Sequence, residues 1–220
     1  MRKLEVRKET ILDSLVREFI KTAEPVSSMH LAEKAELAVS SATVRNELAD
    51  LENDGFLVQP HTSAGRVPTE AAYRYFVEYL SHPQKNDSVS HSRFQAFFKD
   101  RDDVKAAAKM LAALTKECAF VLFEPNDTYY TGLTNLFSQP EFGEREIAVN
   151  ISGALDQLDE AVSKLKPEGV VKTLIGCECP LDRRSSIVYA NAGKRIVGVV
   201  GLVRMDYEKI IGLLNSLNRF

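Results

Sequence analysis

The stretch Ser40-Ser41-Ala42-Thr43-Val44-Arg45-Asn46 predicts the start of a helix that presents polar side chains to solvent. Ser40 is a favoured residue type for a helix N-terminal cap. Three apolar residues recur at i, i+4 and i+7 and share the face that packs in a core: Val44, Leu48 and Leu51. The side chains then left near the outward N-terminal end are Ser41, Thr43, Arg45 and Asn46.

The stretch Pro60-His61-Thr62-Ser63-Ala64-Gly65-Arg66 predicts the loop of a β-hairpin after this helix. Asn53-Asp54-Gly55 ends the helix, because Gly suits a left-handed cap. A shorter helix, capped by Ser27 or Ser28, precedes it. Short helix, turn, longer helix and hairpin, in that order, predict a winged helix-turn-helix. In that motif the second helix enters the DNA major groove and the hairpin forms the wing.

The chemistry of these side chains suits DNA. Arg reads guanine bidentately and Asn reads adenine, whereas hydroxyls and a helix N-terminus suit phosphate. The predicted DNA-binding residues are Ser40, Ser41, Thr43, Arg45, Asn46, His61, Thr62, Ser63, Gly65, Arg66 and Arg74. The alternative for the helix residues is a solvated face. The alternative for Arg66 is an ion pair, although its neighbours in sequence are not acidic.

The net charge of −3 is not that of a bulk nucleic-acid binder. Residues 1–80 alone hold 10 basic and 13 acidic side chains. However, no acid occurs between Gly55 and Thr69, a segment that contains His61 and Arg66. We therefore expect a local basic footprint, weak non-specific binding and more reliance on base or shape readout.

The composition turns polar from Ser81 to Ser92, which predicts a linker between a DNA-binding domain at 1–80 and a second domain at 93–220. Helices and strands there do not alternate strictly, so we expect an α+β fold. The expected elements are a helix at 104–116, a strand at 119–123, a turn at 124–127, an irregular apolar stretch at 129–142, an amphipathic helix at 147–165, a strand at 170–175, a hairpin of 187–191 with 195–203, and a closing helix at 207–217.

Several function classes are disfavoured by the sequence. It contains no catalytic motif, so we expect neither an enzyme nor a cofactor. Cys177-Glu178-Cys179 lacks the ligand spacing of a zinc site, so we expect no metal. Asp156, Asp159 and Glu160 lie opposite an apolar stripe and are expected to be solvated. No apolar run reaches membrane-spanning length, and the start is not typical of a signal peptide. Three cysteines fit a reducing cytoplasm.

With these residues placed, the chain resembles the heat-inducible transcription repressors of the HrcA family. The segments that carry the resemblance are Glu24–Ser28, Ser40–Leu48, Leu51-Glu52, Pro60–Thr69, Tyr73-Arg74, Asn135–Phe142, Gly176-Cys177-Glu178, Val197–Gly201 and Arg204–Tyr207. The resemblance implies a GAF-like second domain, repression of chaperone operons from an inverted-repeat operator, a homodimer, and dependence on a GroEL-type chaperonin.

The chain departs from the family pattern in two places. Leu202-Val203 replaces the Pro-Thr that usually precedes Arg204. The family also carries an inserted dimerisation domain after the strand at 119–123, whereas residues 124–130 bridge that gap here. We therefore expect a weak dimer. A second function class stays open, in which the GAF-like domain of a transcription regulator senses a small molecule.

Overall fold

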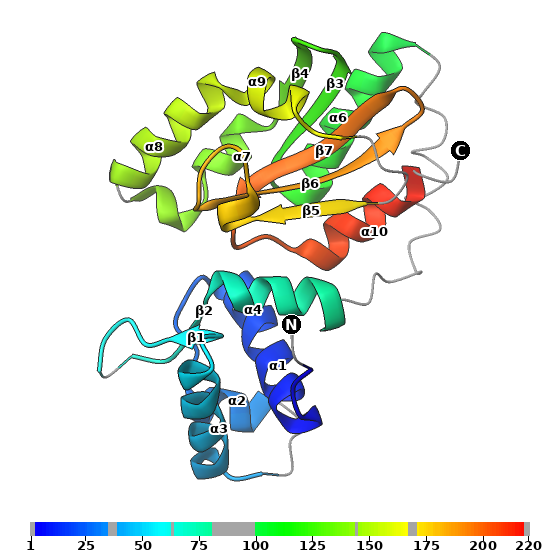
Figure 1. Ribbon diagram of the computed structural model, residues 1–220. Coiled ribbons are helices and arrows are strands. Elements are labelled where there is room, and N and C mark those ends of the chain that lie inside the picture. The colour runs from blue at the N-terminus through cyan, green and yellow to red at the C-terminus, as the bar shows by residue number, and fades with distance from the viewer. Residues whose placement is uncertain are drawn as a thin grey trace. The chain divides into compact units, whose positions relative to one another are not determined.

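The computed structural model describes residues 3–34, 39–62, 64–80, 100–143, 145–166 and 171–217. The chain divides into two compact units, Met1–Ser81 and His82–Phe220 (Figure 1). The segment expected to be a linker, 81–92, lies outside the described residues. Each unit buries apolar side chains of its own.

The N-terminal unit consists of helices and a short hairpin, coloured blue to cyan in Figure 1. Its elements are α1 (Val6–Thr22), α2 (Ser28–Lys34), α3 (Ser41–Asn53), β1 (Leu57–Val58), β2 (Val67–Pro68), α4 (Glu70–Tyr75) and a π-helical turn, η1 (Phe76–Leu80). The strands pair antiparallel, with Leu57 opposite Pro68 and Val58 opposite Val67. The predicted order of short helix, longer helix and hairpin is confirmed for this unit.

The core of the N-terminal unit forms where the apolar stripes of its helices meet. The fully buried side chains include Ile11, Leu12, Leu15, Val16, Leu31, Val44, Leu51 and Phe76. Tyr75 is also buried, and its hydroxyl donates to Glu9 Oε1 at 2.6 Å and accepts from the Leu4 amide at 2.8 Å. A buried hydroxyl with two partners satisfies its hydrogen-bonding needs. This pair of bonds fastens α4 to the start of α1.

Gly55 and Thr69 stand at opposite ends of the hairpin. Gly55 has φ +81°, so it supplies the left-handed cap of α3 as predicted. Thr69 precedes α4, but its side chain makes no cap hydrogen bond. Its hydroxyl donates instead to the carbonyls of Gly55 (2.7 Å) and Phe56 (3.0 Å). The threonine therefore joins the two ends of the hairpin.

The C-terminal unit is built on one antiparallel sheet of five strands in the order β4-β3-β7-β6-β5 (Figure 1). The strands are β3 (Cys118–Glu124), β4 (Asp127–Thr131), β5 (Lys172–Ile175), β6 (Ser185–Ala192) and β7 (Arg195–Leu202). The predicted 187–203 hairpin is the β6–β7 pair, which turns at Gly193. The expected α+β class is confirmed.

Helices cover both faces of this sheet. They are α6 (Arg101–Thr115), α7 (Leu133–Phe137), α8 (Arg145–Asp156), α9 (Leu158–Ser163) and α10 (Tyr207–Leu217), with 3-10 turns η2 (Pro140–Gly143) and η3 (Gly176–Glu178). Because side chains alternate along a strand, Phe120 and Leu122 face α9. Ala119 and Val121 point to the other face, where α6 packs on β3 and α10 packs on β6.

Two expectations for the C-terminal unit were wrong. The stretch 129–142 is not irregular, because it continues β4 and contains α7 and η2. As an edge strand whose side chains are mostly half-buried, β4 lacks the alternation that would have revealed it. The single helix expected at 147–165 is two helices, since the backbone leaves helical geometry at Gln157 (φ −101°, ψ 9°). The strand expected from 170 begins at Lys172, and Val170 lies outside the described residues.

A two-residue turn, Pro125-Asn126, joins β3 to β4, and Asn126 has φ +65°. The Arg101 guanidinium forms a bidentate ion pair with the carboxylate of Asp127, the residue after this turn, with N–O distances of 2.6 and 2.5 Å. The same guanidinium lies 4.1 Å from the centre of the Phe123 ring. Bidentate and cation–π contacts of this kind fix geometry at a surface.

Within the described residues, no helix has the length and apolar character needed to cross a membrane. In the same part of the chain, no group of three His, Cys, Asp or Glu side chains is placed to hold a metal ion. Cys118 and Cys179 are buried, whereas Cys177 is exposed. Asp156, Asp159 and Glu160 are exposed as expected.

Glu117 is an exception to the apolar interior of the C-terminal unit. It precedes β3 and is only 4 % exposed. Its Oε2 is buried and has no hydrogen-bond partner among the described residues. Burial raises the pKa of Glu117 to about 8, against the opposing effect of the nearby Arg204 cation. The carboxyl group is therefore largely neutral at pH 7.

We predict that Glu117→Gln removes a pH-dependent loss of stability. Between its ordinary pKa of 4.5 and about 8, Glu117 keeps a proton in the folded state that the unfolded chain releases. Wild-type stability therefore falls as pH rises through this range, by roughly 4 kcal/mol for this group. Hydrogen exchange of β3 amides in urea at pH 5 and pH 8.5 measures the fall. Glu124→Gln, at the exposed end of the same strand, should keep it, and an equal fall in Glu117→Gln would contradict the prediction.

Candidate nucleic-acid interface

The N-terminal half of α3 presents the polar side chains of Arg45 and Asn46 to solvent. Val44, Leu48 and Leu51 are buried, which turns Arg45 and Asn46 outward. Both are exposed, and neither makes a side-chain hydrogen bond or ion pair among the described residues. A free guanidinium and a free amide on one exposed helix end can read base edges.

The start of α3 has the predicted cap. Ser40 Oγ accepts a hydrogen bond from the Thr43 amide at 3.2 Å and lies 3.0 Å from the Thr43 hydroxyl. The side chains of Ser40 and Thr43 therefore already hold the first turn. Ser41 is exposed in that turn. Amides at a helix N-terminus suit an anion such as phosphate.

The acids of α3 lie toward its C-terminal end and are each compensated. Glu47 pairs with Arg7 at 3.5 Å, and Lys8 lies 3.0 Å from Asp50 and 3.8 Å from Asp54. The hydrogen bond with Asp50 raises the pKa of Lys8. Two cations of α1 therefore partly offset the charge of these three acids. Arg45 is left as the cation without an ion pair among the described residues of α3.

The hairpin loop, residues 59–66, contains the remaining predicted contacts. His61 and Thr62 are exposed, and Ser63 lies outside the described residues. Gly65 has a packing role, because a Cβ there would lie 2.4 Å from the carbonyl carbon and oxygen of Val26. The next residue, Arg66, pairs its backbone with Val26 through two hydrogen bonds of 2.9 and 2.8 Å. The base of the loop is thus packed against the segment between α1 and α2.

Both other predicted arginines have acidic partners. Arg66 Nε donates to Glu52 Oε2 at 2.8 Å, and its side chain is 18 % exposed. Sequence proximity did not reveal this partner, which lies 14 residues earlier on α3. Arg74 forms an ion pair with Glu70 one turn earlier on α4. Arg66 and Arg74 would therefore have to leave an acidic partner to bind phosphate, whereas Arg45 has no such partner in the described part of the chain.

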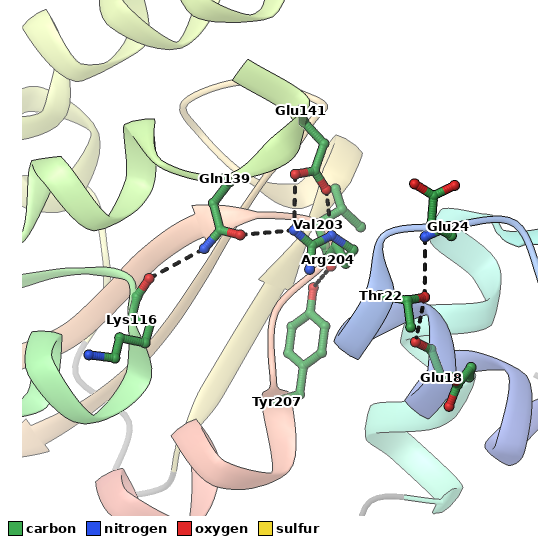
Figure 2. Close-up of polar contacts among 9 residues, drawn as sticks. All are labelled: Glu18, Thr22, Glu24, Lys116, Gln139, Glu141, Val203, Arg204 and Tyr207. Carbon is green, nitrogen blue, oxygen red and sulfur yellow. Dashed lines mark hydrogen bonds and ion pairs between the residues drawn. The ribbon is translucent and has the colours of Figure 1, made fainter. Parts of the chain in front are cut away.

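A buried acid that sequence reasoning missed holds α2 against α1. Glu18 is buried, and its carboxylate contacts His30 Nε2 at 2.9 Å and the Lys34 ammonium group. The Lys34 contact lowers the pKa of Glu18. Figure 2 shows how the Thr22 hydroxyl, bonded to the Glu18 carbonyl, accepts from the Glu24 amide. The available signal was the position of Glu18, three residues after Leu15 within the apolar stripe.

The C-terminal unit contains a separate polar network, also drawn in Figure 2. Arg204 binds the Glu141 carboxylate through two bonds of 2.5 and 3.0 Å and donates to Gln139 Oε1 at 2.8 Å. Gln139 donates in turn to the Lys116 carbonyl at 3.3 Å. Asp206 caps α10 by accepting from the Lys209 amide at 3.2 Å. Arg204 therefore has a structural role in joining η2 to the start of α10.

The family model and the relatives that match this chain all point to one protein family. A family model described as the HrcA protein C terminal domain matches residues 76–211. A Frankia casuarinae protein named heat-inducible transcription repressor HrcA is 42 % identical over 204 residues, which are 91 % of this chain and 58 % of that protein. A Pelotomaculum thermopropionicum protein of the same name is 43 % identical over 125 residues, which are 54 % of this chain and 36 % of that protein. The chain belongs to the HrcA family.

The chain spans about half the length of the curated relatives it matches. A crystal structure described as that of a hypothetical protein superposes with a TM-score of 0.83, covering 99 % of this chain and 97 % of that one. Its sequence is 19 % identical, so this likeness shows the fold alone.

We predict that Ser40→Ala destabilises the N-terminal unit by ~0.5–2 kcal/mol, because the Thr43 amide loses its cap. Ser40→Asp keeps an acceptor at the same place and should retain most of the stability. Urea unfolding, followed by hydrogen exchange of α3 amides, measures both changes. Equal stability of wild type and Ser40→Ala would contradict a stabilising role for this cap.

Proposed function

We propose that the N-terminal unit is a winged helix-turn-helix that binds double-stranded DNA and that the chain represses transcription. The observation that carries this proposal is the exposed end of α3, where Arg45 and Asn46 have no partner in the described ranges while the acids Asp50 and Glu52 are paired. The names of the relatives, heat-inducible transcription repressors, support repression as the outcome of binding.

The proposed contacts fall into two groups. Arg45 and Asn46 read base edges, and Ser41 with the amides around the capped first turn binds phosphate. Ser40 and Thr43 shape that turn. In the wing, defined as residues 59–66, the exposed His61 and Thr62 contact the DNA backbone. The predicted wing residue Ser63 and the paired Arg74 remain candidates for phosphate contacts.

The regulated genes are proposed to be chaperone operons with an inverted-repeat operator, in the cytoplasm. A GroEL-type chaperonin is the proposed partner that keeps the repressor active. These assignments rest on the family and on the names of its members, since the chain spans only about half of the relatives' length.

The C-terminal unit is proposed to be a reduced GAF-like domain that serves regulation or assembly. The alternative, a small-molecule sensor, would need a polar cavity on the sheet. The face toward α9 instead has closely packed apolar side chains, among them Phe120, Ile187 and Val200. This packing supports the repressor without a small-molecule ligand.

A gel-shift titration of the full chain on the chaperonin-operon promoter tests this function, with a scrambled duplex of equal length as competitor. The salt concentration must be fixed, because phosphate contacts make affinity depend strongly on salt. Preference for the promoter supports the proposal, whereas equal affinity for the scrambled duplex refutes it.

We predict that Arg45→Ala weakens binding to the operator by ~1–3 kcal/mol, as expected for loss of a bidentate base contact. Its effect on scrambled DNA should be smaller, because base reading contributes little there. Arg183→Ala, which removes the same charge from an exposed position of the C-terminal unit, is the matched control and should spare the preference for the operator. Unchanged operator affinity and base preference in Arg45→Ala would exclude this role.

We also predict a concentration-dependent dimer. An inverted repeat needs two recognition helices, and one chain presents one. The family's insert has no room in the two-residue turn between β3 and β4. The candidate surfaces are α1, α4 and the segment 133–142, in which Leu136 is buried and Phe137 is 41 % exposed. Sedimentation over a wide concentration range decides the matter. A tight dimer at the lowest concentration refutes a weak interface, and a strict monomer on operator DNA refutes two-fold binding.

A further inference from the structure

Glu52 connects α3 to both sides of the wing. Its Oε2 accepts from Arg66 Nε at 2.8 Å, beside β2. Its Oε1 accepts from the Gln59 amide at 3.2 Å, just after β1. The Glu52 side chain is 32 % exposed and that of Arg66 is 18 % exposed. One carboxylate on the helix is therefore shared between the two strands of the hairpin.

Gln59 extends this connection into the loop. Its side-chain amide donates to the Thr62 carbonyl at 3.0 Å and to the Ala64 carbonyl at 2.9 Å. The loop thus closes around the Gln59 side chain, while the Gln59 backbone is bonded to Glu52. A continuous path of hydrogen bonds leads from α3 to the exposed part of the wing.

The opposite side of the wing is fixed by backbone contacts. Arg66 and Val26 form an isolated antiparallel bridge, and Gly65 lies against the same segment. These contacts hold the wing to the connection between α1 and α2. On the side of α3, the Phe56 amide donates to the Leu51 carbonyl at 2.9 Å, and the Glu52 carboxylate adds the side-chain contacts between the helix and the wing.

The other acids of α3 do not share this role. Glu47 and Asp50 of α3, and Asp54 just after it, pair with cations of α1 rather than with the wing. Partly exposed ion pairs contribute little to stability. The Glu52 contacts therefore matter for the orientation of the wing and for its charge. They occupy the Arg66 guanidinium, which could otherwise bind any phosphate.

We propose that Glu52 is a positioning residue for sequence recognition: it sets the wing relative to the reading end of α3 and restrains Arg66 from non-specific phosphate binding. This inference rests on the proposed DNA binding. It reassigns Arg66 from a direct phosphate contact to the anchor of the wing.

The test compares Glu52→Gln with Asp50→Asn in the full chain, on the operator duplex and on its scrambled version over a range of salt concentrations. Each variant removes one negative charge and one ion pair from α3. For Glu52→Gln we expect the ratio of operator to scrambled affinity to fall about tenfold. Loss of one base contact through a misplaced wing weakens operator binding by about that factor. We also expect the salt slope on scrambled DNA to steepen by about one, because Arg66 becomes available to phosphate. Asp50→Asn should keep the wild-type ratio.

A second measurement uses the free protein, so it does not depend on DNA. Glu52→Ala removes the acceptor of the Gln59 backbone amide. This amide should then exchange with solvent at least about tenfold faster, while the backbone amides of α1 keep their wild-type protection. Asp50→Ala is the control and should leave Gln59 protected. Unchanged exchange at Gln59 would overturn the positioning role.

The outcomes separate the two proposals. A wild-type chain without preference for the operator refutes the proposed function, whatever the variants do. A wild-type preference that Glu52→Gln leaves intact, or that Asp50→Asn reduces equally, overturns the inference on Glu52 alone.

Discussion

The N-terminal unit depends on one geometric constraint, the burial of Val44, Leu48 and Leu51 on a single face of α3. Because a helix repeats every 3.6 residues, burying this face fixes which side chains point away from the core. Arg45 and Asn46 point outward for that reason, and Glu52 can reach the hairpin. The same helix therefore provides an exposed polar end, part of the core of the unit and the anchor of the loop beside it. Its acids pair with cations of α1 and with Arg66, and Arg45 stays an exposed cation on a unit with net negative charge.

The C-terminal unit follows a different principle, in which charged side chains brace irregular connections around an apolar sheet. Arg204 is shared by Glu141 and Gln139, and Gln139 reaches the end of α6. Asn135 joins α7 to the same end of α6, because its side-chain amide donates to the carbonyls of Ala112 (3.0 Å) and Glu117 (3.3 Å). The sequence segments 135–142 and 204–207 thus belong to one brace. Glu117 lies in the same region, and its buried Oε2 has no hydrogen-bond partner within the described part of the chain.

Periodicity and turn chemistry predicted much of the fold. The stripe on α3, the Ser40 cap, the Gly55 cap and the turn at Gly193 are local signals, and each was confirmed. The strand β4 was missed because an edge strand of half-exposed residues has no alternation to detect. The Glu52–Arg66 and Glu18–Lys34 pairs were missed because their partners are 14 and 16 residues apart. Contacts of that range depend on how elements fold back on each other, and side-chain patterns along one segment do not report them.

The turn at Pro125-Asn126 has a consequence for the evolution of the fold. Its two ends are adjacent and antiparallel, held by the Glu124–Asp127 register and by the Arg101 fork on Asp127. A hairpin of this kind is a natural point of insertion, because chain that leaves and returns there places no demand on the sheet beneath it. A lineage can then gain or lose a whole oligomerisation module at this junction while the N-terminal unit, with α3 and its hairpin, keeps the same framework.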